Sequence, residues 1–472
     1  MIPEFAILGH PNEGKSSVLS TLTEDDSVRI SAEPGETIKC RTFPVIIDNR
    51  EIIRFTDTPG FQNPTRMLSE MQKFSESSED PLQRFYRRYH NDDDLRHDCE
   101  LLRPLLRGAG ILYVADGSRP LRQVDLAEME ILRLTGKPRM AILNCKRGEE
   151  EYSPQWKAQF RKHFNSSRVF NAHRADYRQR IRLLEALKSI EQDWQEVLDY
   201  VVTTFKDDWR NRNYRTSELI SELLTDCLQL KMEKNVAPET SLEPAKKELF
   251  HRYTAKLAHL ENLCHREMRK IFKHNVFDYR LPSHSILHQD LFADETWQFL
   301  GLSRSQLAIT GGAGGAALAA GLDLAAGGAS LGLFTSIGGA LGAFGAVYGS
   351  RNIASKIKVL GIGTATIKLQ IGPNTNPQFP FIVLDRALLY YSHITTWAHG
   401  RRDYDASLSE KSPPVLTRSL PRTSLKTIGH YFRMLQKNGS DVADAEDTFK
   451  KLIMRQLNVV SGAEEYEDND FH

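Results

Sequence analysis

Short apolar runs alternate with helix-compatible stretches along the first part of the chain. Runs typical of buried strands cover residues 5–8, 41–47, 51–56, 110–116, 140–144 and 167–171. Helix-compatible stretches between them cover residues 17–22, 62–107, 126–134 and 156–164. This alternation predicts a mainly parallel, doubly wound α/β sheet over residues 1–195.

One pair of predicted strands differs from this parallel pattern. Residues 41–47 and 51–56 are separated only by a short cluster of turn-forming residues, Asp48, Asn49 and Arg50. Such a cluster between two strands favours a β-hairpin. The sequence therefore predicts one antiparallel hairpin in an otherwise parallel sheet.

Beyond the predicted sheet, the pattern changes to long helical periodicity. Apolar residues recur at steps of three and four up to about residue 300, without a strand signal, which predicts a helical bundle or stalk over residues 196–304. A mixed pattern returns over residues 352–472. There we expect a strand pair at 366–371 and 379–384, helices at 387–397 and 442–457, a linker at 404–425 and a disordered acidic tail at 464–470.

A segment dominated by glycine and alanine occupies residues 305–351. Asp323 is the only charged residue between positions 305 and 350, and repeated G-x-x-x-G pairs leave one helix face bare for close packing. The 27 uncharged residues 324–350 would span about 40 Å as a helix, enough for the roughly 30 Å core of a bilayer. We expect a helical hairpin that contacts a membrane; a tightly packed hairpin in water or a contact between copies of the chain is the alternative.

Nine residues near the start of the chain carry the first chemical signal. They are Gly9, His10, Pro11, Asn12, Glu13, Gly14, Lys15, Ser16 and Ser17, and they match G-x-x-x-x-G-K-[ST] between a predicted strand and a predicted helix. The glycines allow successive N–H groups to turn towards an anion. Lys15 is expected to reach the β- and γ-phosphates of a nucleotide, and Ser16 to bind Mg²⁺. The sequence thus predicts a phosphate-binding loop.

A second motif directly follows the predicted hairpin. Asp57 and Gly60 are the first and last residues of a D-x-x-G sequence, the element with which GTPases hold Mg²⁺ through water and sense the γ-phosphate. Thr37, between the two motifs, is the candidate switch threonine on Mg²⁺, with an ordinary loop threonine as the alternative. Together the motifs predict a P-loop nucleotide hydrolase with Ser16, Thr37 and Asp57 around the metal.

With these motifs, the first 195 residues resemble the Era/TrmE family of translation-factor-related GTPases, whose loop reads G-x-P-N-x-G-K-S. The resemblance implies a G domain, GTP as substrate and Mg²⁺ as cofactor. It also implies that Asn12 holds a K⁺ ion that acts like an arginine finger; a purely loop-stabilising side chain is the alternative. A GTPase domain followed by a Gly-rich apolar segment is similar to a bacterial group whose C-terminal domain has no known function.

Two departures from the family pattern affect the expected chemistry. Phe61 stands where Ras-like proteins use a glutamine to orient water, so intrinsic hydrolysis is expected to be slow. At the guanine-reading N-K-x-D motif, the chain has Asn144 and Lys146, but Arg147 replaces the aspartate. Asn144 and Lys146 are candidate nucleotide-binding residues, and the preference for guanine follows from the resemblance alone.

Composition adds few constraints. A chain of 472 residues predicts two or three domains, and a net charge of +1 gives no general argument for nucleic-acid binding. Five widely separated cysteines without C-x-x-C spacing are expected to be the reduced thiols of a cytoplasmic protein. The basic, aromatic segment 84–90 is interpreted as an exposed helix face rather than an RNA-binding patch, and no signal peptide is expected.

These patterns lead to one main hypothesis about function. We expect a Mg²⁺-dependent switch that binds GTP and GDP and hydrolyses GTP, with Lys15, Thr37 and Asn12 as catalytic residues. Its helical half is expected to act on a membrane or membrane-protein partner, or to form homo-oligomers. The chain is expected to be cytoplasmic, or peripheral or conditionally inserted at the inner membrane. The alternatives are a soluble nucleotide-binding protein that binds RNA or protein with little hydrolysis, and a dynamin-like membrane-remodelling GTPase.

Overall fold

The chain divides into two compact units. Unit 1 comprises Met1–Trp209, Thr395–Asp403 and Ser461–Ala463, and the rest of the chain forms unit 2. The computed structural model describes residues 2–23, 39–47, 49–74, 79–145, 151–171, 177–237, 241–272, 285–310, 357–362, 367–395, 416–437 and 442–463. The expected domain boundaries at residues 195, 304 and 351 stay predictions.

Unit 1 is built on a six-stranded sheet with the order β2-β3-β1-β4-β5-β6. Strands β2 and β3 form an antiparallel hairpin, and all other neighbours are parallel. The strands are β1 (Glu4–Leu8), β2 (Arg41–Ile47), β3 (Arg50–Asp57), β4 (Gly110–Asp116), β5 (Arg139–Asn144) and β6 (Ser166–Phe170). The sequence-based prediction of a mainly parallel α/β sheet with one hairpin is confirmed.

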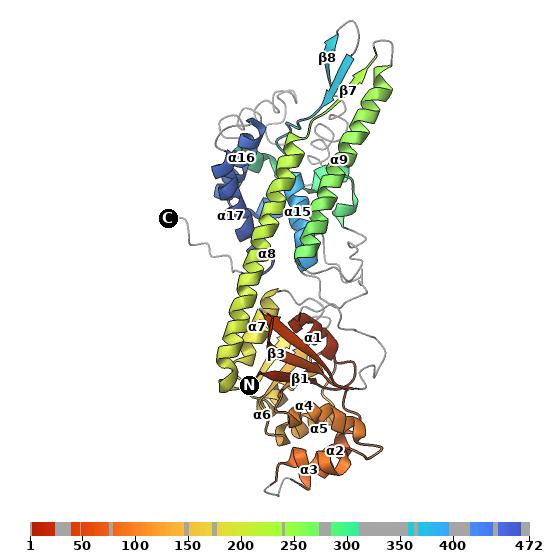
Figure 1. Cartoon of the computed structure of the whole chain (residues 1–472), viewed down its shortest axis with the longest axis vertical. Coiled ribbons are helices and arrows are strands. Elements are labelled where there is room, and N and C mark those ends of the chain that lie inside the picture. Colours follow the sequence, from red (N-terminus) through yellow and green to blue (C-terminus); the bar gives the residue numbers. More distant parts are fainter. Residues whose placement is uncertain are drawn as a thin grey trace. The chain divides into compact units, whose positions relative to one another are not determined.

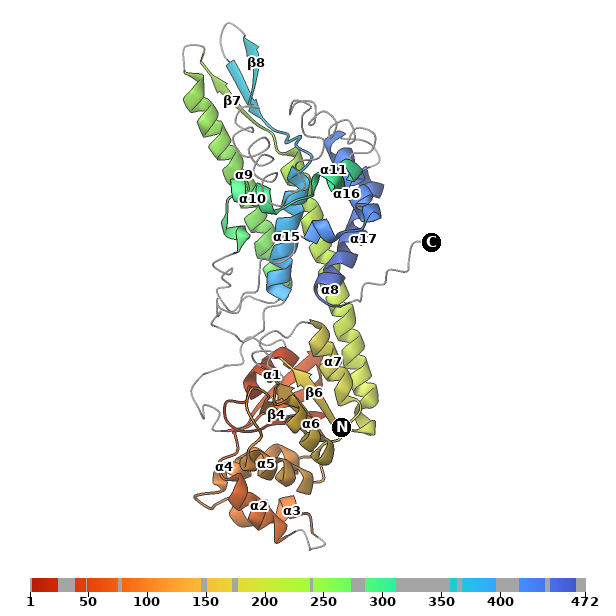
Figure 2. The same cartoon turned by 180° about the vertical axis from the view of Figure 1, so that it is seen from behind.

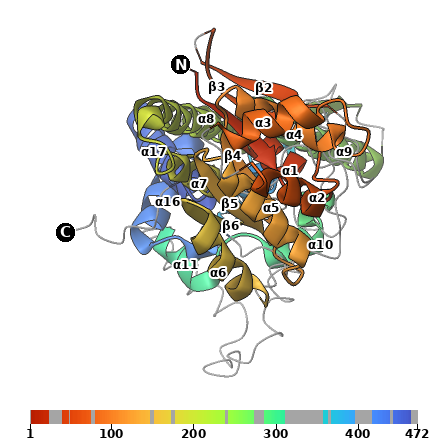
Figure 3. The same cartoon turned by 90° about the horizontal axis from the view of Figure 1, so that it is seen from below.

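Helices cover both faces of this sheet (Figures 1 and 3). Helices α1 and α7 pack on one face, and α2 to α6 share a continuous apolar core with the other. The helices are α1 (Lys15–Thr23), α2 (Pro64–Gln72), α3 (Pro81–Tyr89), α4 (Arg96–Leu106), α5 (Gln123–Leu134), α6 (Ser153–His163) and α7 (Tyr177–Leu187), followed by the 3-10 turn η1 (Gln192–Trp194). Three of them, α2 to α4, lie in the polar segment between β3 and β4 that was predicted to be helix-permissive.

Unit 2 is mostly helical, with a small antiparallel sheet of order β7-β9-β8. Its boundary with unit 1 falls inside α8 (Gln195–Gln229). The other elements are β7 (Met232–Val236), α9 (Leu242–Ile271), η2 (Ile286–His288), α10 (Asp294–Phe299), α11 (Arg304–Thr310), β8 (Lys358–Ile362), β9 (Ile367–Ile371), α15 (Phe379–Thr395), η4 (Leu416–Ser419), α16 (Arg422–Lys437) and α17 (Val442–Val460).

Helix α15 is the centre of unit 2, and its residues are buried along almost its whole length. Figure 2 shows it beside α9, α10 and α16. Tyr390 stacks on His265 of α9 with ring centroids 3.8 Å apart, Phe381 packs edge-on against Phe432 of α16, and the Tyr391 hydroxyl donates a hydrogen bond to the Asn213 side chain of α8. One buried helix therefore organises the surrounding helices.

Three sequence-based predictions for unit 2 are wrong. Strand β7 lies in the region predicted to lack strands, because its polar residues are stabilised by pairing with distant β9. Residues 379–384 form the first turns of α15 instead of a strand, since a short apolar run does not distinguish a buried strand from a buried helix. The end of the predicted linker 404–425 contains η4 and the start of α16, which begins directly after Pro421.

Several other predictions fall on residues outside the described part of the chain. These are the apolar residues 311–350, the acidic tail, Thr37, Lys146 and Arg147. Among the described residues, no helix combines the length and the apolar character that crossing a bilayer requires.

Candidate functional site

The loop between β1 and α1 has the backbone geometry of an anion-binding turn. Gly9, Asn12 and Gly14 adopt positive φ angles of 143°, 66° and 96°. A Cβ atom on Gly9 would lie 2.2 Å from the carbonyl oxygen of Val114, so only glycine fits there. Asparagine tolerates the left-handed conformation better than most residues, which explains Asn12 in the loop. The conformation lets successive N–H groups face one point.

Lys15 begins helix α1, and its side chain crosses the loop. The Nζ atom donates hydrogen bonds to the carbonyl oxygens of Gly9 at 3.1 Å and His10 at 2.9 Å. Burial lowers the pKa of Lys15, whereas the negative charges of Asp57, Glu128 and Glu13 oppose this shift. The loop therefore holds a cationic side chain where the motif requires one for phosphate.

Two predicted metal ligands meet at the mouth of the loop. The Ser16 hydroxyl at the start of α1 donates a hydrogen bond to Asp57 Oδ2 at the end of β3, at 3.3 Å. A hydroxyl and a carboxylate are oxygen ligands of the kind that Mg²⁺ prefers. The two side chains fit the metal that the sequence predicts, and Thr37, the third predicted ligand, is outside the described residues.

The D-x-x-G segment contacts the phosphate loop directly. The Thr58 hydroxyl donates a hydrogen bond to the carbonyl oxygen of Ile7 in β1, at 2.7 Å. A Cβ atom on Gly60 would lie 2.6 Å from Cδ of Pro11, so this glycine is required by the close approach of the two motifs. The next residue, Phe61, is 1% exposed and belongs to the apolar core beneath α2 to α6. Its ring therefore does not face the phosphate loop.

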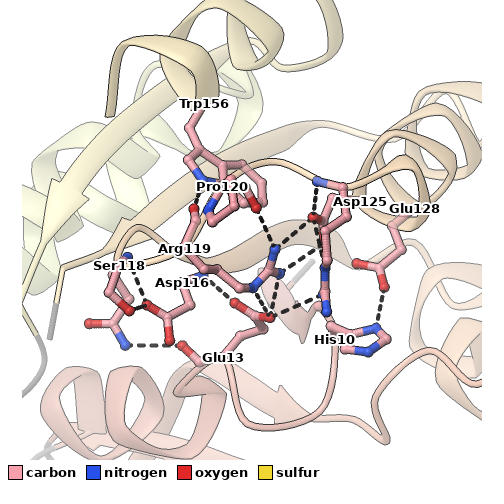
Figure 4. Close-up of polar contacts among 12 residues, drawn as sticks. His10, Glu13, Asp116, Ser118, Arg119, Pro120, Asp125, Glu128 and Trp156 are labelled. Atoms are coloured by element: carbon pink, nitrogen blue, oxygen red, sulfur yellow. Dashed lines mark hydrogen bonds and ion pairs between the residues drawn. The ribbon is translucent and has the colours of Figure 1, made fainter. Parts of the chain in front are cut away.

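An ionic network with two buried carboxylates supports the phosphate loop (Figure 4). The Arg119 guanidinium lies between Glu13 and Asp125 and donates hydrogen bonds to both carboxylates. Arg122 donates a further hydrogen bond to Asp125 at 3.1 Å. The Arg119 side chain also lies over the ring of Trp156, at 5.2 Å from its centroid. The network joins the loop to the β4–α5 connection and to helices α5 and α6.

A second contact joins the loop to helix α5. His10 Nδ1 lies 2.8 Å from Glu128 Oε1, and the Tyr113 hydroxyl donates a hydrogen bond to Glu128 Oε2 at 2.9 Å. Burial raises the pKa of Glu128, whereas the hydrogen bonds with His10 and Tyr113 lower it. The side chains of His10 and Glu13 thus anchor the loop to the protein and do not face the point to which its N–H groups turn.

Asn144 ends strand β5 and is completely buried. Its Nδ2 atom donates a hydrogen bond to the backbone oxygen of Glu13 at 3.0 Å, which places the first residue of the degraded N-K-x-D motif against the phosphate loop. Cys145 follows and is also buried. A cavity of about 650 Å³ lies beside the ends of β5 and β6, lined by Cys145, Phe170 and Asn171 together with residues of β6 and α7. In open α/β sheets, ligands bind at the carboxyl ends of the strands, where this cavity lies.

Comparison with known families assigns both parts of the chain. Residues 4–145 match the family described as 50S ribosome-binding GTPase. Residues 157–458, more than half of the chain, match the family of a domain of unknown function, DUF3482. The chain belongs to the DUF3482 family. Its N-terminal part is a P-loop GTPase domain, as the sequence predicts.

The similarity of this DUF3482 protein to curated relatives covers a minor part of the chain. GTPase Der of Desulforudis audaxviator is 28% identical over 142 residues, which are 30% of this chain and 27% of that protein. GTPase Der of Mycoplasmoides gallisepticum is 34% identical over 77 residues, 16% of each chain. The matched region thus spans a small fraction of either relative.

Two solved structures are also similar to the DUF3482 protein. One is Era in complex with MgGDPNP and a fragment of 16S ribosomal RNA, with 16% identity over 58% of this chain and 89% of that chain and a TM-score of 0.28. The other is NFeoB from S. thermophilus bound to GDP·AlF₄⁻ and K⁺, with 16% identity, the same coverage and a TM-score of 0.27.

The sequence located the loop and the D-x-x-G motif of the DUF3482 protein, but not what supports them. Residues 9–14 lie between β1 and α1, and Lys15, Ser16 and Ser17 form the first turn of α1. Asp57, Gly60 and Asn144 lie beside this loop. Arg119, Asp125 and Glu128 were not recognised, because more than a hundred residues separate them from the loop and no motif includes them. The one available signal was an acidic residue, Glu13, inside a loop that binds anions.

Proposed function

We propose that this DUF3482 protein is a GTP-hydrolysing switch whose N-terminal domain binds Mg²⁺ and GTP. The observation that carries this proposal is the meeting of two motifs: Ser16 Oγ lies 3.3 Å from Asp57 Oδ2, and Gly60 packs against Pro11. A nucleotide in the loop would therefore place its terminal phosphate beside the D-x-x-G segment. Gain or loss of that phosphate would then change the conformation of the residues that follow Gly60.

The chain's own residues supply binding and charge stabilisation. Lys15 and the N–H groups of the loop neutralise the phosphate oxygens, which is the main catalytic contribution in phosphoryl transfer. Ser16, Thr37 and Asp57 would hold Mg²⁺, which supplies further positive charge beside the β- and γ-phosphates. The buried Phe61 cannot orient water by hydrogen bonding, and slow intrinsic hydrolysis is expected.

Asn12 is the proposed site of K⁺ activation. Support comes from its position in the phosphate loop, where it has a positive φ angle of 66°. Hydrolysis is expected to be faster in K⁺ than in Na⁺, and Asn12→Ala is expected to remove that difference while GDP binding persists. Equal rates in the two salts would refute a role for K⁺.

The first experiment compares binding and hydrolysis of GTP and ATP by the full chain in Mg²⁺. Lys15→Ala is expected to slow hydrolysis by at least about 100-fold, the cost of losing one charge-stabilising donor. Lys157→Ala is the matched control, because Lys157 is an exposed lysine of α6 in the same unit. Hydrolysis that survives Lys15→Ala would refute the assignment. Preferential binding of ATP would refute guanine specificity. The sequence does not establish that specificity, because Arg147 replaces the base-reading aspartate.

For the C-terminal half, we propose a membrane or membrane-protein partner. Support comes from the sequence of residues 324–350, which carries 27 consecutive uncharged residues rich in glycine and alanine. The full chain with GDP or a GTP analogue is expected to float with liposomes in at least one nucleotide state. Absence of flotation in every state would refute this part of the proposal and favour a soluble partner. Hydrolysis stimulated by liposomes would instead indicate a dynamin-like activity.

A further inference from the structure

Asp98 of α4 makes a long-range contact with the segment that follows the D-x-x-G motif. The residue is completely buried. Its Oδ1 atom accepts a hydrogen bond from the backbone N–H of Gln62 at 2.9 Å, and its Oδ2 atom accepts one from the backbone N–H of Asn63 at 3.1 Å. Both carboxylate oxygens are therefore used on two successive amides, only two and three residues beyond Gly60.

This contact caps helix α2 from a distant part of the chain. Asn63 is the N-cap residue of α2, and its own side chain makes no capping hydrogen bond. The first N–H groups of a helix lack partners within the helix, and its amino end favours a negative charge. Asp98 supplies both the acceptor and the charge. Asp98 of α4 thus binds the two amides that lead into α2, in addition to Pro64, which favours the first helical position.

The short segment 58–63, which joins the end of β3 to α2, is anchored at both ends. At one end, Thr58 bonds to β1 and Gly60 packs on Pro11. At the other end, Asp98 holds the two amides, and between the anchors Phe61 is buried in the apolar core. The Gln62 and Asn63 amides follow Gly60 by only two and three residues. We therefore expect a displacement of Gly60 to shift these amides, and a displacement of the amides to shift Gly60.

A separate surface contact joins α2 to the α3–α4 connection. Arg66 in the first turn of α2 pairs with Asp92 at 3.2 Å and with Asp94 of the α3–α4 connection. The Arg66 side chain is 43% exposed, and exposed pairs contribute little to stability. Arg66 therefore joins α2 to the same part of the protein without contacting the backbone beside Gly60.

We propose that Asp98 is a positioning residue for the γ-phosphate-sensing loop: it fixes the backbone of Gln62 and Asn63 and thereby holds Gly60 against the phosphate loop. The inference rests on the proposed function and adds to it. Under this proposal, α4 is the element whose contacts respond to whether GTP or GDP is bound. Loss of the carboxylate is expected to lower kcat and the discrimination between GTP and GDP, while GDP affinity stays within about twofold.

The test compares Asp98→Ala with Asp98→Asn in the full chain. Asparagine keeps one acceptor oxygen and the shape of the side chain, so it is expected to retain part of the activity that alanine loses. For alanine we expect kcat to fall by about 10- to 100-fold, the scale of a misplaced catalytic segment. KM for GTP is expected to change much less than kcat.

Two control variants separate positioning from a general loss of stability. Arg66→Ala removes the surface contact between α2 and the α3–α4 connection and is expected to leave kcat unchanged. Asp385→Asn alters a buried carboxylate of unit 2 that also accepts two backbone N–H groups, from Gly301 and Thr417. It is expected to affect unfolding without altering kcat. A fall in kcat in either control as large as that in Asp98→Ala would overturn the proposal.

A second measurement does not depend on hydrolysis. Hydrogen exchange of the Gln62 and Asn63 amides is expected to be at least about tenfold faster in Asp98→Asn than in the wild type, because one acceptor is replaced. Binding of GDP and of a non-hydrolysable GTP analogue is then compared in both proteins. Faster exchange with unchanged discrimination between the two nucleotides overturns the inference. A wild type that binds but does not hydrolyse GTP refutes the proposed function alone, and the exchange and binding results still decide the role of Asp98.

Discussion

Removal of Arg119 is the sharpest test of the network that supports the phosphate loop. The side chains of Glu13 and Asp125 are 5% and 0% exposed, and the Arg119 guanidinium is hydrogen-bonded to both. Burial by itself lowers the pKa of Arg119, but the bonds to Asp125 and Glu13 outweigh it and raise that pKa. In Arg119→Ala, two buried carboxylates would lose their main cation.

The magnitude follows from what remains after the substitution. Breaking a buried ion pair by removing one partner costs about 3–5 kcal/mol. Arg122 still reaches Asp125 at 3.1 Å and Glu13 at 3.7 Å, so we expect the lower end of that range. For a unit of this size, about 3 kcal/mol corresponds to a fall in Tm of about 6–12 °C.

The assay is thermal unfolding of the full chain with and without GDP and Mg²⁺. The transition whose midpoint temperature rises when nucleotide is added reports on unit 1. Arg133→Ala is the control, because Arg133 pairs with Glu130 on the surface of α5, the helix that carries Asp125. It is expected to change stability by less than about 1 kcal/mol. If Arg119→Ala unfolds within 2 °C of the Arg133→Ala control, the network does not support the loop as described.

Combining Arg119→Ala with Glu13→Gln provides an internal check. The second substitution removes one of the two carboxylates that the first leaves without its main cation. The double variant is therefore expected to be more stable than the sum of the two single changes predicts, by about 1–3 kcal/mol. Additive effects would show that the two side chains do not interact energetically.

Two further predictions concern other parts of the chain. Gly60→Ala would place a Cβ atom 2.6 Å from Pro11, so it is expected to slow single-turnover hydrolysis by about tenfold or more with GDP binding retained; an unchanged rate would contradict the close approach of the two motifs. Burial raises the pKa of Asp385 to about 6, so its contribution to stability is complete below its unfolded pKa and is lost as the pH rises through 6. Relative to Asp385→Asn, the wild type should therefore lose about 2 kcal/mol of unfolding free energy between pH 4 and pH 6.5, measured by urea unfolding. A constant difference between the two proteins across that range would show that the environment of Asp385 does not disfavour its charge.

Local sequence order was enough to predict unit 1 because its features are contiguous. The strand–loop–helix context of Lys15, the turn residues before Arg50 and the position of Asp57 at the end of a strand are all visible within short windows. The helices around Asp98 were expected only as helix-permissive sequence. The hydrogen bonds that the Gln62 and Asn63 amides donate to Asp98 join residues about 35 positions apart, and no residue pattern indicates them.

Unit 2 was harder to predict because its structure depends on distant partners. Strand β7, with the sequence Met-Glu-Lys-Asn-Val, is too polar to indicate a strand, and its partner β9 begins at Ile367. In α15, Asp385 and Arg386 interrupt an apolar run with charges that would suggest a surface position. Both are buried, because Asp385 bonds to Gly301 and Thr417 and Arg386 pairs with Glu261.

The two adjacent charges of α15 also bear on how members of this family could diverge. Asp385 fixes Gly301 and Thr417, which lie shortly before residue 311 and just after residue 415, the limits of two segments of the chain. Arg433 of α16 donates a hydrogen bond to the backbone oxygen of Thr310, the last residue of α11. The described residues nearest these limits, Gly301, Thr310 and Thr417, are thus held by side chains of α15 and α16. Sequence changes beyond these limits would leave the hydrogen bonds of Asp385 and Arg433 in place, so members of the family can differ there while these contacts of the described helices are retained.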